Sequence, residues 1–136
     1  MDARDIHAVS LAVLVNGRFL LVRRGHPPAK GLFAFPGGRV ETGEDAETAI
    51  RRELREETGL SAGAVSLFRE ITIEGESGRR YLLKVFRAEE VEGAMREGDD
   101  ADHVGWYTLS EMRSLPITAS TLAVAEDIAA GGERPL

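Results

Sequence analysis

The chain has 136 residues, enough for one domain with a hydrophobic core, and we expect residues 1–136 to form a single domain. Its 17 basic and 23 acidic residues give a formal net charge of −6, which disfavours binding of a nucleic acid polymer through its phosphates. It contains no cysteine, which excludes disulfides, thiolate metal sites and cysteine nucleophiles, so any metal must be held by oxygen or histidine ligands.

The N-terminal segment predicts a β-hairpin. Residues 7–15 and 18–24 are rich in valine and leucine, and they flank Asn16-Gly17, a strong signal for a tight turn between antiparallel strands. The apolar run is shorter than the ~18 residues of a membrane span, and no cleavage pattern follows it. We therefore expect a cytoplasmic protein with no membrane partner.

A loop and a helix follow the hairpin. Pro27 and Pro28 predict a loop over residues 25–30, and residues 32–35 should be extended because Pro36 follows them. Residues 45–58 carry apolar side chains at helical spacing, with Asp45 as N-cap and Gly59 just beyond the end.

The second half of the chain returns to strands. Residues 65–73 and 80–88 predict two strands joined by a turn at 75–78, residues 104–108 a further short strand, and residues 120–130 a final helix. Strands on both sides of a central helix, with a second helix at the end, indicate an α+β domain. We expect an α/β/α sandwich with a mixed, largely antiparallel sheet.

Three glutamates of the central helix lie on or beside its apolar stripe. At about 100° per residue, Glu53, Glu56 and Glu57 continue the stripe, whereas arginines occupy the opposite side, together with Thr58. Like charges at this spacing repel, and the C-terminal end of a helix disfavours anions. A divalent cation such as Mg²⁺ or Mn²⁺ would compensate these charges and would let an acidic protein bind an anionic substrate.

The sequence around this helix resembles the Nudix box, G-x5-E-x7-R-E-U-x-E-E-x-G-U, in which U is apolar. Residues 38–60 match every defined position, from Gly38 and Glu44 to Leu60. A chance match has a probability on the order of 10⁻⁹ per start position. The hairpin, the Phe35-Pro36-Gly37-Gly38 segment and the Gly105-Trp106-Tyr107 strand are also typical of this family. The resemblance implies the family's α/β/α sandwich.

The resemblance also implies roles within the motif. Glu56 and Glu57 are implied as metal ligands, and Glu53 as a third ligand or as the base that deprotonates water. Gly37 or Gly38 would offer a backbone carbonyl to the metal.

Further residues are implied in supporting roles. Glu44 and Arg52 would orient the ligands, although a plain surface salt bridge would show the same spacing. Many relatives add a carboxylate from the loop before the last strand, and here Glu97 is the first candidate and Asp100 the second. A flexible acidic connector is the alternative for that loop.

Substrate contacts are expected at the end of the second strand. Either Arg23 or Arg24 could clamp phosphate oxygens, since alternation turns only one of them inward. Phe35, Tyr81 and Trp106 could stack on a base, although aromatic residues in strands more often belong to the core. His7, His26 and His103 show no metal-ligand spacing.

The implied reaction is hydrolysis of a nucleoside diphosphate linked to a group X, giving a nucleoside monophosphate and X-phosphate. ADP-ribose or a related small nucleotide is the first candidate substrate, and an ordinary or oxidised nucleoside triphosphate, as for MutT-like members, is the second. A non-catalytic Nudix module that only binds nucleotide is the alternative of another class. The chain is expected to act as a monomer or a homodimer.

Overall fold

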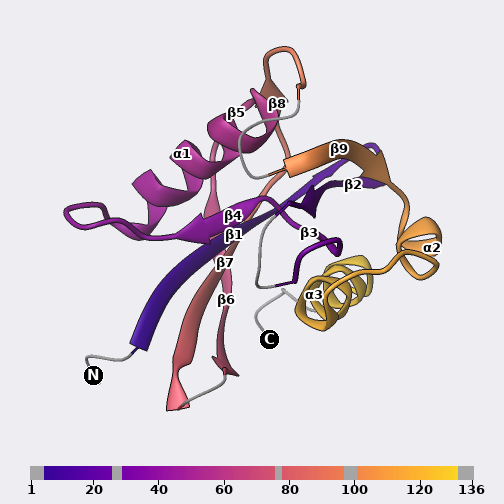
Figure 1. The fold of residues 1–136 in the computed structure, drawn as a ribbon. Helices are drawn as coiled ribbons and strands as arrows, with labels where there is room; N and C mark the ends of the chain where they lie inside the picture. The colour runs from indigo at the N-terminus through magenta and orange to yellow at the C-terminus, as the bar shows by residue number, and fades with distance from the viewer. Residues whose placement is uncertain (1–4, 26–28, 76–77, 97–100, 132–136) are drawn as a thin grey trace.

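The structure is a computed structural model, and it describes residues 5–25, 29–75, 78–96 and 101–131 (Figure 1). The elements follow one another along the chain as β1 (Asp5–Val15), β2 (Arg18–Arg24), β3 (Phe33–Ala34), β4 (Gly37–Arg39), α1 (Ala46–Thr58), β5 (Ser61–Ala62), β6 (Ser66–Glu74), β7 (Arg80–Ala88), β8 (Val91–Glu92), β9 (Ala101–Tyr107), α2 (Leu109–Met112) and α3 (Ala119–Ala129). None of these helices is long and apolar enough to cross a membrane.

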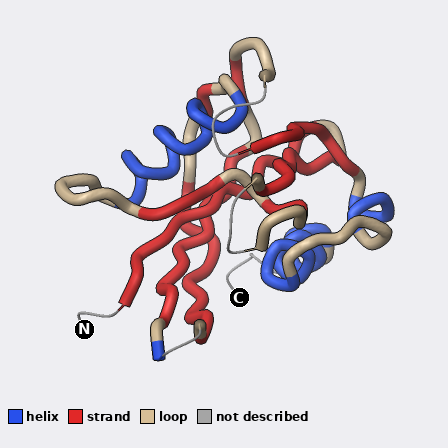
Figure 2. Tube along the Cα trace, viewed as in Figure 1, coloured by secondary structure: helices blue, strands red, loops and turns tan. Residues whose placement is uncertain are grey.

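Within the described residues, seven strands form one mixed sheet. Its order is β3-β2-β1-β7-β6, with β4 paired to β1 and β9 paired to β2. The pairing of β1 with β7 is parallel, and the other pairings are antiparallel. A separate two-stranded ribbon joins β5 to β8. The mixed sheet with helices on both sides confirms the predicted α+β sandwich (Figures 1 and 2).

The hairpin between β1 and β2 closes as the Asn16-Gly17 signal predicts. Asn16 has φ 51° and Gly17 has φ 77°, the left-handed pair that matches the twist of the flanking strands. Leu14 then pairs with Phe19 and Val15 with Arg18. The turn therefore sets the register of β2 against β1.

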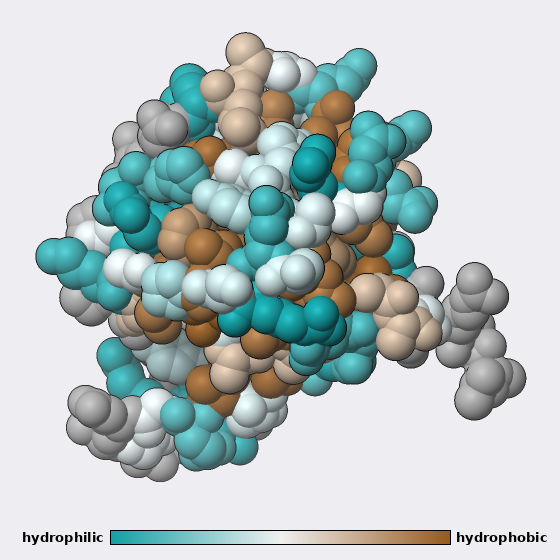
Figure 3. Space-filling view, turned by 90° about the vertical axis from the view of Figure 1, so that its right-hand side faces the viewer, coloured by the Kyte–Doolittle hydropathy of each residue, from teal (hydrophilic) through white to brown (hydrophobic). Residues whose placement is uncertain are grey.

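Side-chain alternation along β2 divides the core between the two faces of the sheet. Leu20 and Val22 join the core beneath α1, whereas Phe19 and Leu21 join the core beneath α3. The same sheet is thus covered by α1 on one face and by α3 on the other. Apolar and polar side chains are interspersed on the side that carries α2 and α3 (Figure 3).

Several boundaries differ from the sequence-based expectation. The last strand begins at residue 101 instead of 104, and the short elements β4, β5, β8 and α2 were not predicted. Elements of two to four residues have too few side chains to show a periodicity, so they depend on tertiary pairing. The helix α2 has a capping box in which Thr108 and Glu111 bond each other's backbone N–H.

The core beneath α1 gives a stability prediction. Leu54 is fully buried between α1 and the sheet, so replacing it with alanine should leave a cavity and lower the free energy of unfolding by about 2–5 kcal/mol. Arg55→Ala, at the next and exposed position of the same helix, is the matched control and should change it by less than about 0.5 kcal/mol. Urea denaturation measures both values, and equal effects would contradict the assignment of the buried face.

Candidate functional site

The helix α1 begins and ends at residues suited to those positions. The side chain of Asp45 accepts a hydrogen bond from the Thr48 N–H at 2.8 Å, which caps the first turn. Gly59 follows the last turn with φ 78°, and its N–H donates to the Arg55 carbonyl. These two caps fix where the glutamates of α1 stand along the sheet.

The three glutamates of α1 do not share one environment. The exposed fractions of Glu53 and Glu57 are 8% and 3%, as expected for the inward stripe. The side chain of Glu56 is 48% exposed, so the prediction that all three acids continue the buried stripe is wrong for this residue. Thr58, expected on the opposite side, is fully buried and donates its hydroxyl to the Leu54 carbonyl at 2.6 Å.

Two glycines of β4 let its backbone approach these carboxylates. The Gly37 N–H donates to Glu57 Oε1 at 2.8 Å. A Cβ atom at Gly38 would lie 2.6 Å from the Glu53 Cδ atom, closer than real contacts allow. Only glycine fits at this position while Glu53 keeps its place. The structure thus brings Gly37, Gly38, Glu53 and Glu57 together.

Arg52 connects the remaining members of the motif. Its guanidinium binds Glu44 through two hydrogen bonds of 2.7 and 2.9 Å, and it also donates to Glu56 at 3.1 Å and to Glu53 at 3.2 Å. A fifth hydrogen bond, 3.1 Å long, reaches the Arg39 carbonyl oxygen. The side chains of Arg52 and Glu44 are only 20% and 12% exposed, so this is a partly buried network and not a plain surface salt bridge.

The network holds both of its central groups in their charged forms. The hydrogen bond from Arg52, and next that from the Glu41 N–H, lower the pKa of Glu44 from 4.5 to about 2. The hydrogen bond to Glu44 in turn raises the pKa of Arg52. Arg52 therefore remains a fixed cation beside Glu53 and Glu56.

The candidates Glu97 and Asp100 lie outside the described residues. The chain just before them is described, and it contacts the C-terminal end of α1. The Arg96 N–H donates to the Thr58 carbonyl at 2.8 Å, and a Cβ atom at Gly59 would lie 2.8 Å from the Ala94 carbonyl oxygen. The chain therefore approaches position 97 from a point beside the last turn of α1.

The two arginines at the end of β2 stand at an irregularity of the sheet. Arg23 continues the series of Phe19 and Leu21 toward α3, and its Nε donates to Asp102 at 2.7 Å. The register against β9 shifts between Arg23 and Arg24, so the alternation along β2 does not extend to Arg24. The sequence contains no signal for the Arg23–Asp102 pair, since 79 positions separate the two residues.

The expectation that Phe35 could stack on a substrate base is wrong for this structure. Phe35 is 3% exposed and belongs to the core beneath α3, where its ring centroid lies 6.0 Å from that of Phe19. A fully packed ring offers no face to a ligand. Trp106 is partly buried against the core beneath α1.

The donor set suits a hard divalent cation. Carboxylate oxygens and glycine carbonyls are the ligands that Mg²⁺ and Mn²⁺ prefer, and two carboxylates are buried where the helix end disfavours anions. No three carboxylate or imidazole groups already form a metal-binding cluster among the described residues. Glu53 and Glu56 instead contact Arg52, and Glu57 contacts the Gly37 N–H. Glu56 could therefore bind a cation by turning away from Arg52 or through its second carboxylate oxygen.

Comparisons with known proteins agree with this arrangement. The family model described as the NUDIX domain matches residues 5–126. An ADP-ribose pyrophosphatase of Methanocaldococcus jannaschii is 35% identical over 109 residues, which cover 79% of this chain and 64% of that protein. An 8-oxo-dGDP phosphatase of Mus musculus is 32% identical over 110 residues, which cover 76% of this chain and 33% of that protein. The chain thus spans less than two thirds of the length of either relative.

A solved structure extends the similarity to the fold. The MutT NUDIX hydrolase from Burkholderia pseudomallei superimposes with a TM-score of 0.83 at 27% sequence identity, covering 91% of this chain and 98% of that one. The family-model match over residues 5–126 includes the hairpin, the Gly37–Gly38 segment and the glutamate helix α1. The chain belongs to the Nudix family.

Proposed function

We propose that this chain is a divalent-metal-dependent pyrophosphohydrolase that cleaves the diphosphate bond of a nucleoside diphosphate linked to a group X. The products would be a nucleoside monophosphate and X-phosphate. The observation that carries the proposal is the burial of Glu53 and Glu57 against the glycine backbone of β4. Buried carboxylates without a catalytic or binding role are rare, because removing a charge from water costs several kcal/mol.

The residues of α1 and β4 would hold the metal. Glu56 and Glu57 are the proposed ligands, with Glu53 as a third ligand or as the general base, and Gly37 or Gly38 would add a carbonyl oxygen. Bound Mg²⁺ or Mn²⁺ would neutralise the diphosphate and lower the pKa of the attacking water. Glu97 is a further proposed ligand or base, supported by the course of the chain up to Arg96.

The rest of the site would position the reactants. Arg52 and Glu44 would orient Glu53 and Glu56, since the guanidinium contacts both glutamates. One of the two arginines that end β2 is the proposed clamp on the nonbridging phosphate oxygens, and Arg24 is the first candidate because Arg23 is paired with Asp102. In the reaction, water forms a bond to one phosphorus, the bond from that phosphorus to the bridging oxygen breaks, and the base takes the proton of the water.

ADP-ribose or a related small nucleotide is the proposed substrate. The similarity to the ADP-ribose pyrophosphatase of Methanocaldococcus jannaschii supports it, at 35% identity. The similarity to the 8-oxo-dGDP phosphatase of Mus musculus favours an oxidised purine nucleotide as the second candidate. For either substrate, the presence of Glu53, Glu56 and Glu57 favours catalytic turnover over binding alone.

The role of Glu57 can be tested with an isosteric change. In Glu57→Gln the amide oxygen can still accept the Gly37 N–H, so the fold should persist while turnover falls by about a hundredfold or more. Glu47→Gln, on the exposed side of the same helix, is the matched control and should retain wild-type turnover. Steady-state rates with Mg²⁺, together with thermal melting of both variants, measure the effect. Wild-type turnover in Glu57→Gln would exclude Glu57 as a ligand.

The pairing of Glu44 with Arg52 predicts a pH-dependent stability. Because the folded-state pKa of Glu44 is about 2 instead of 4.5, the pair stabilises the fold above about pH 4.5, and this contribution is lost as the pH falls toward 2. The difference in unfolding free energy between wild type and Glu44→Gln should therefore be constant near neutral pH and shrink below about pH 4.5. Urea denaturation across this range measures it, and a difference independent of pH would refute the pairing.

The substrate proposal predicts a ranking of activities. With Mg²⁺, the chain should hydrolyse ADP-ribose to AMP and ribose phosphate faster than it hydrolyses 8-oxo-dGDP, 8-oxo-dGTP or dGTP, and a chelator should abolish all turnover. Chromatographic separation of the products measures each rate. A higher kcat/KM for the oxidised nucleotides would assign the second candidate, and binding without turnover of any compound would indicate a non-catalytic module.

A further inference from the structure

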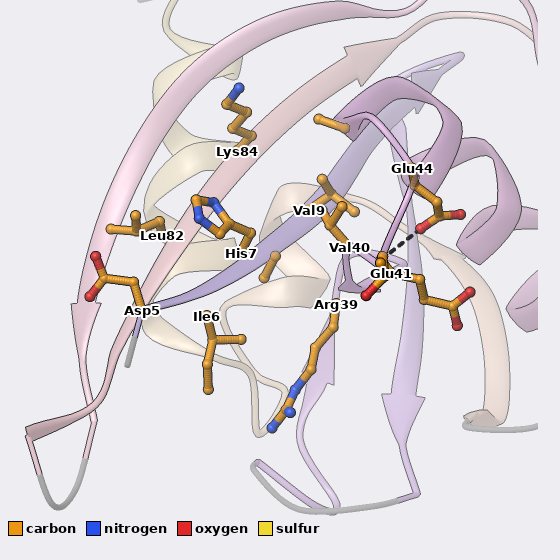
Figure 4. A pocket seen from close by; sticks show the side chains of 13 residues that line it. Asp5, Ile6, His7, Val9, Arg39, Val40, Glu41, Glu44, Leu82 and Lys84 are labelled. Atoms are coloured by element: carbon orange, nitrogen blue, oxygen red, sulfur yellow. Dashed lines mark hydrogen bonds between the residues drawn. The ribbon is translucent and has the colours of Figure 1, made fainter. Parts of the chain in front are cut away.

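A cavity of about 560 Å³ lies on the α1 face of the sheet, beside the N-terminal end of α1 (Figure 4). The strands β1 and β7 form one side of it, and the connection from β4 to α1 forms the other. Its volume is within the range of about 300–1,000 Å³ typical of small-molecule sites. Glu53 and Glu57 do not line it, so it adjoins the site described above and shares only the supporting residues Arg39 and Glu44 with it.

The floor of the cavity is apolar. Val9, Val40 and Leu82 line it together with Ala46 of α1. Val9 is 1% exposed and belongs to the core beneath α1, which makes this floor a rigid part of the fold. The floor can therefore accept the apolar body of a ligand without rearrangement.

The acidic residues around the cavity are already paired with arginines. Asp5 accepts two hydrogen bonds from Arg80, of 2.9 and 3.0 Å, and Glu44 accepts two from Arg52. Glu41 lies 3.6 Å from the Arg52 guanidinium. Asp5 is thus compensated by Arg80, whereas the single charge of Arg52 is shared by four glutamates, so the wall near α1 stays partly acidic.

Two lining cations, Lys84 and Arg39, make no ion pair with any carboxylate among the described residues, and both are exposed. In the parallel register Lys84 stands beside Val9, and Leu82 beside His7. Figure 4 shows the His7 ring next to Leu82, and His7 and Lys84 lie on the strand side of the cavity, across from Glu44.

From this arrangement we propose that the cavity binds a small phosphate monoester that carries a flat apolar body, of the chemical class of a nucleoside monophosphate. The body would rest on Val9, Val40 and Leu82, and the phosphate would be held by Lys84, with the His7 imidazole beside it. The wall opposite Lys84 contains Glu44, which holds Arg52 and through it Glu53 and Glu56. An occupant of the cavity would therefore contact the segment that positions the proposed metal ligands.

The test is binding of AMP to the full chain in the presence of a chelator, so that neither turnover nor metal contributes. Two-dimensional ¹H–¹⁵N NMR follows the amide signals of β1, β7 and the segment before α1, and adenosine and inorganic phosphate serve as partial ligands. AMP should shift the signals of His7, Val40 and Lys84 with one common Kd, and each partial ligand should bind at least about tenfold more weakly.

Variants of the only two lysines of the chain provide the matched comparison. Lys84→Gln should raise the Kd for AMP at these signals about tenfold or more, and Lys84→Arg should restore most of the binding. Lys30→Gln removes the same charge at an exposed position that does not line the cavity, and it should leave the Kd unchanged.

Three results would overturn the proposal: AMP that shifts only signals near Gly37 and Glu57, an unchanged Kd in Lys84→Gln, or adenosine that binds as tightly as AMP. All of these can be observed in a chain that hydrolyses ADP-ribose normally. Conversely, loss of hydrolysis in Glu57→Gln leaves AMP binding at Lys84 intact. The failure of this proposal and the failure of the proposed hydrolase activity are therefore separate outcomes.

Discussion

The hydrogen bond from the Gly37 N–H to Glu57 Oε1 joins the C-terminal half of α1 to the edge strand β4. It is also the contact through which a buried carboxylate is tolerated, because an uncompensated charge at 3% exposure would cost several kcal/mol. Glu53, one turn earlier, lies against Gly38 and accepts a hydrogen bond from Arg52. Glu53 thus requires glycine at position 38, whereas glycine at position 37 is required by the close approach of β4 to Val9 and Ser10 of β1.

Arg52 links the buried glutamates to residues nearer the surface. Its two bonds to Glu44 fix the guanidinium, and the bond to the Arg39 carbonyl ties it to the end of β4. A fixed cation then lies within 3.2 Å of both Glu53 and Glu56. The single charge of Arg52 partly offsets those of Glu53 and Glu56, and the side chain of Glu56 is half exposed, which leaves it room to turn toward a cation. The network thus positions the glutamates and still leaves their side chains able to move.

The sequence predicts the parts of the fold that are encoded locally. The caps Asp45 and Gly59 delimit α1, and Asn16-Gly17 closes the hairpin, because each depends on a few neighbouring residues. The inward direction of Glu53 and Glu57 follows from helical periodicity alone. Periodicity does not predict the exposure of Glu56 and Thr58, which lie at the margin of the stripe. Glu56 is exposed and contacts Arg52, and Thr58 is buried and donates to the Leu54 carbonyl.

Contacts between distant segments are beyond prediction from one sequence. Phe35 is part of the core because β3 meets α3, and Arg23 is paired because β9 lies beside β2. Lys84 and His7 have no shared motif, and only the parallel pairing of β1 with β7 brings them to one cavity. One continuous segment, residues 38–60, is thus enough to predict the family and the type of reaction. The residues that would select a ligand come from distant segments and meet only in the folded chain.

The central claim is that the glutamates of α1 hold a divalent cation, and a crystal structure with Mn²⁺ tests it most directly. Anomalous difference density should place Mn²⁺ about 2.0–2.2 Å from carboxylate oxygens of at least two of Glu53, Glu56 and Glu57, with Glu56 no longer bound to Arg52. Glu56 still bound to Arg52 and Glu57 still bound to the Gly37 N–H, with Mn²⁺ absent from α1 or bound elsewhere, would contradict the account.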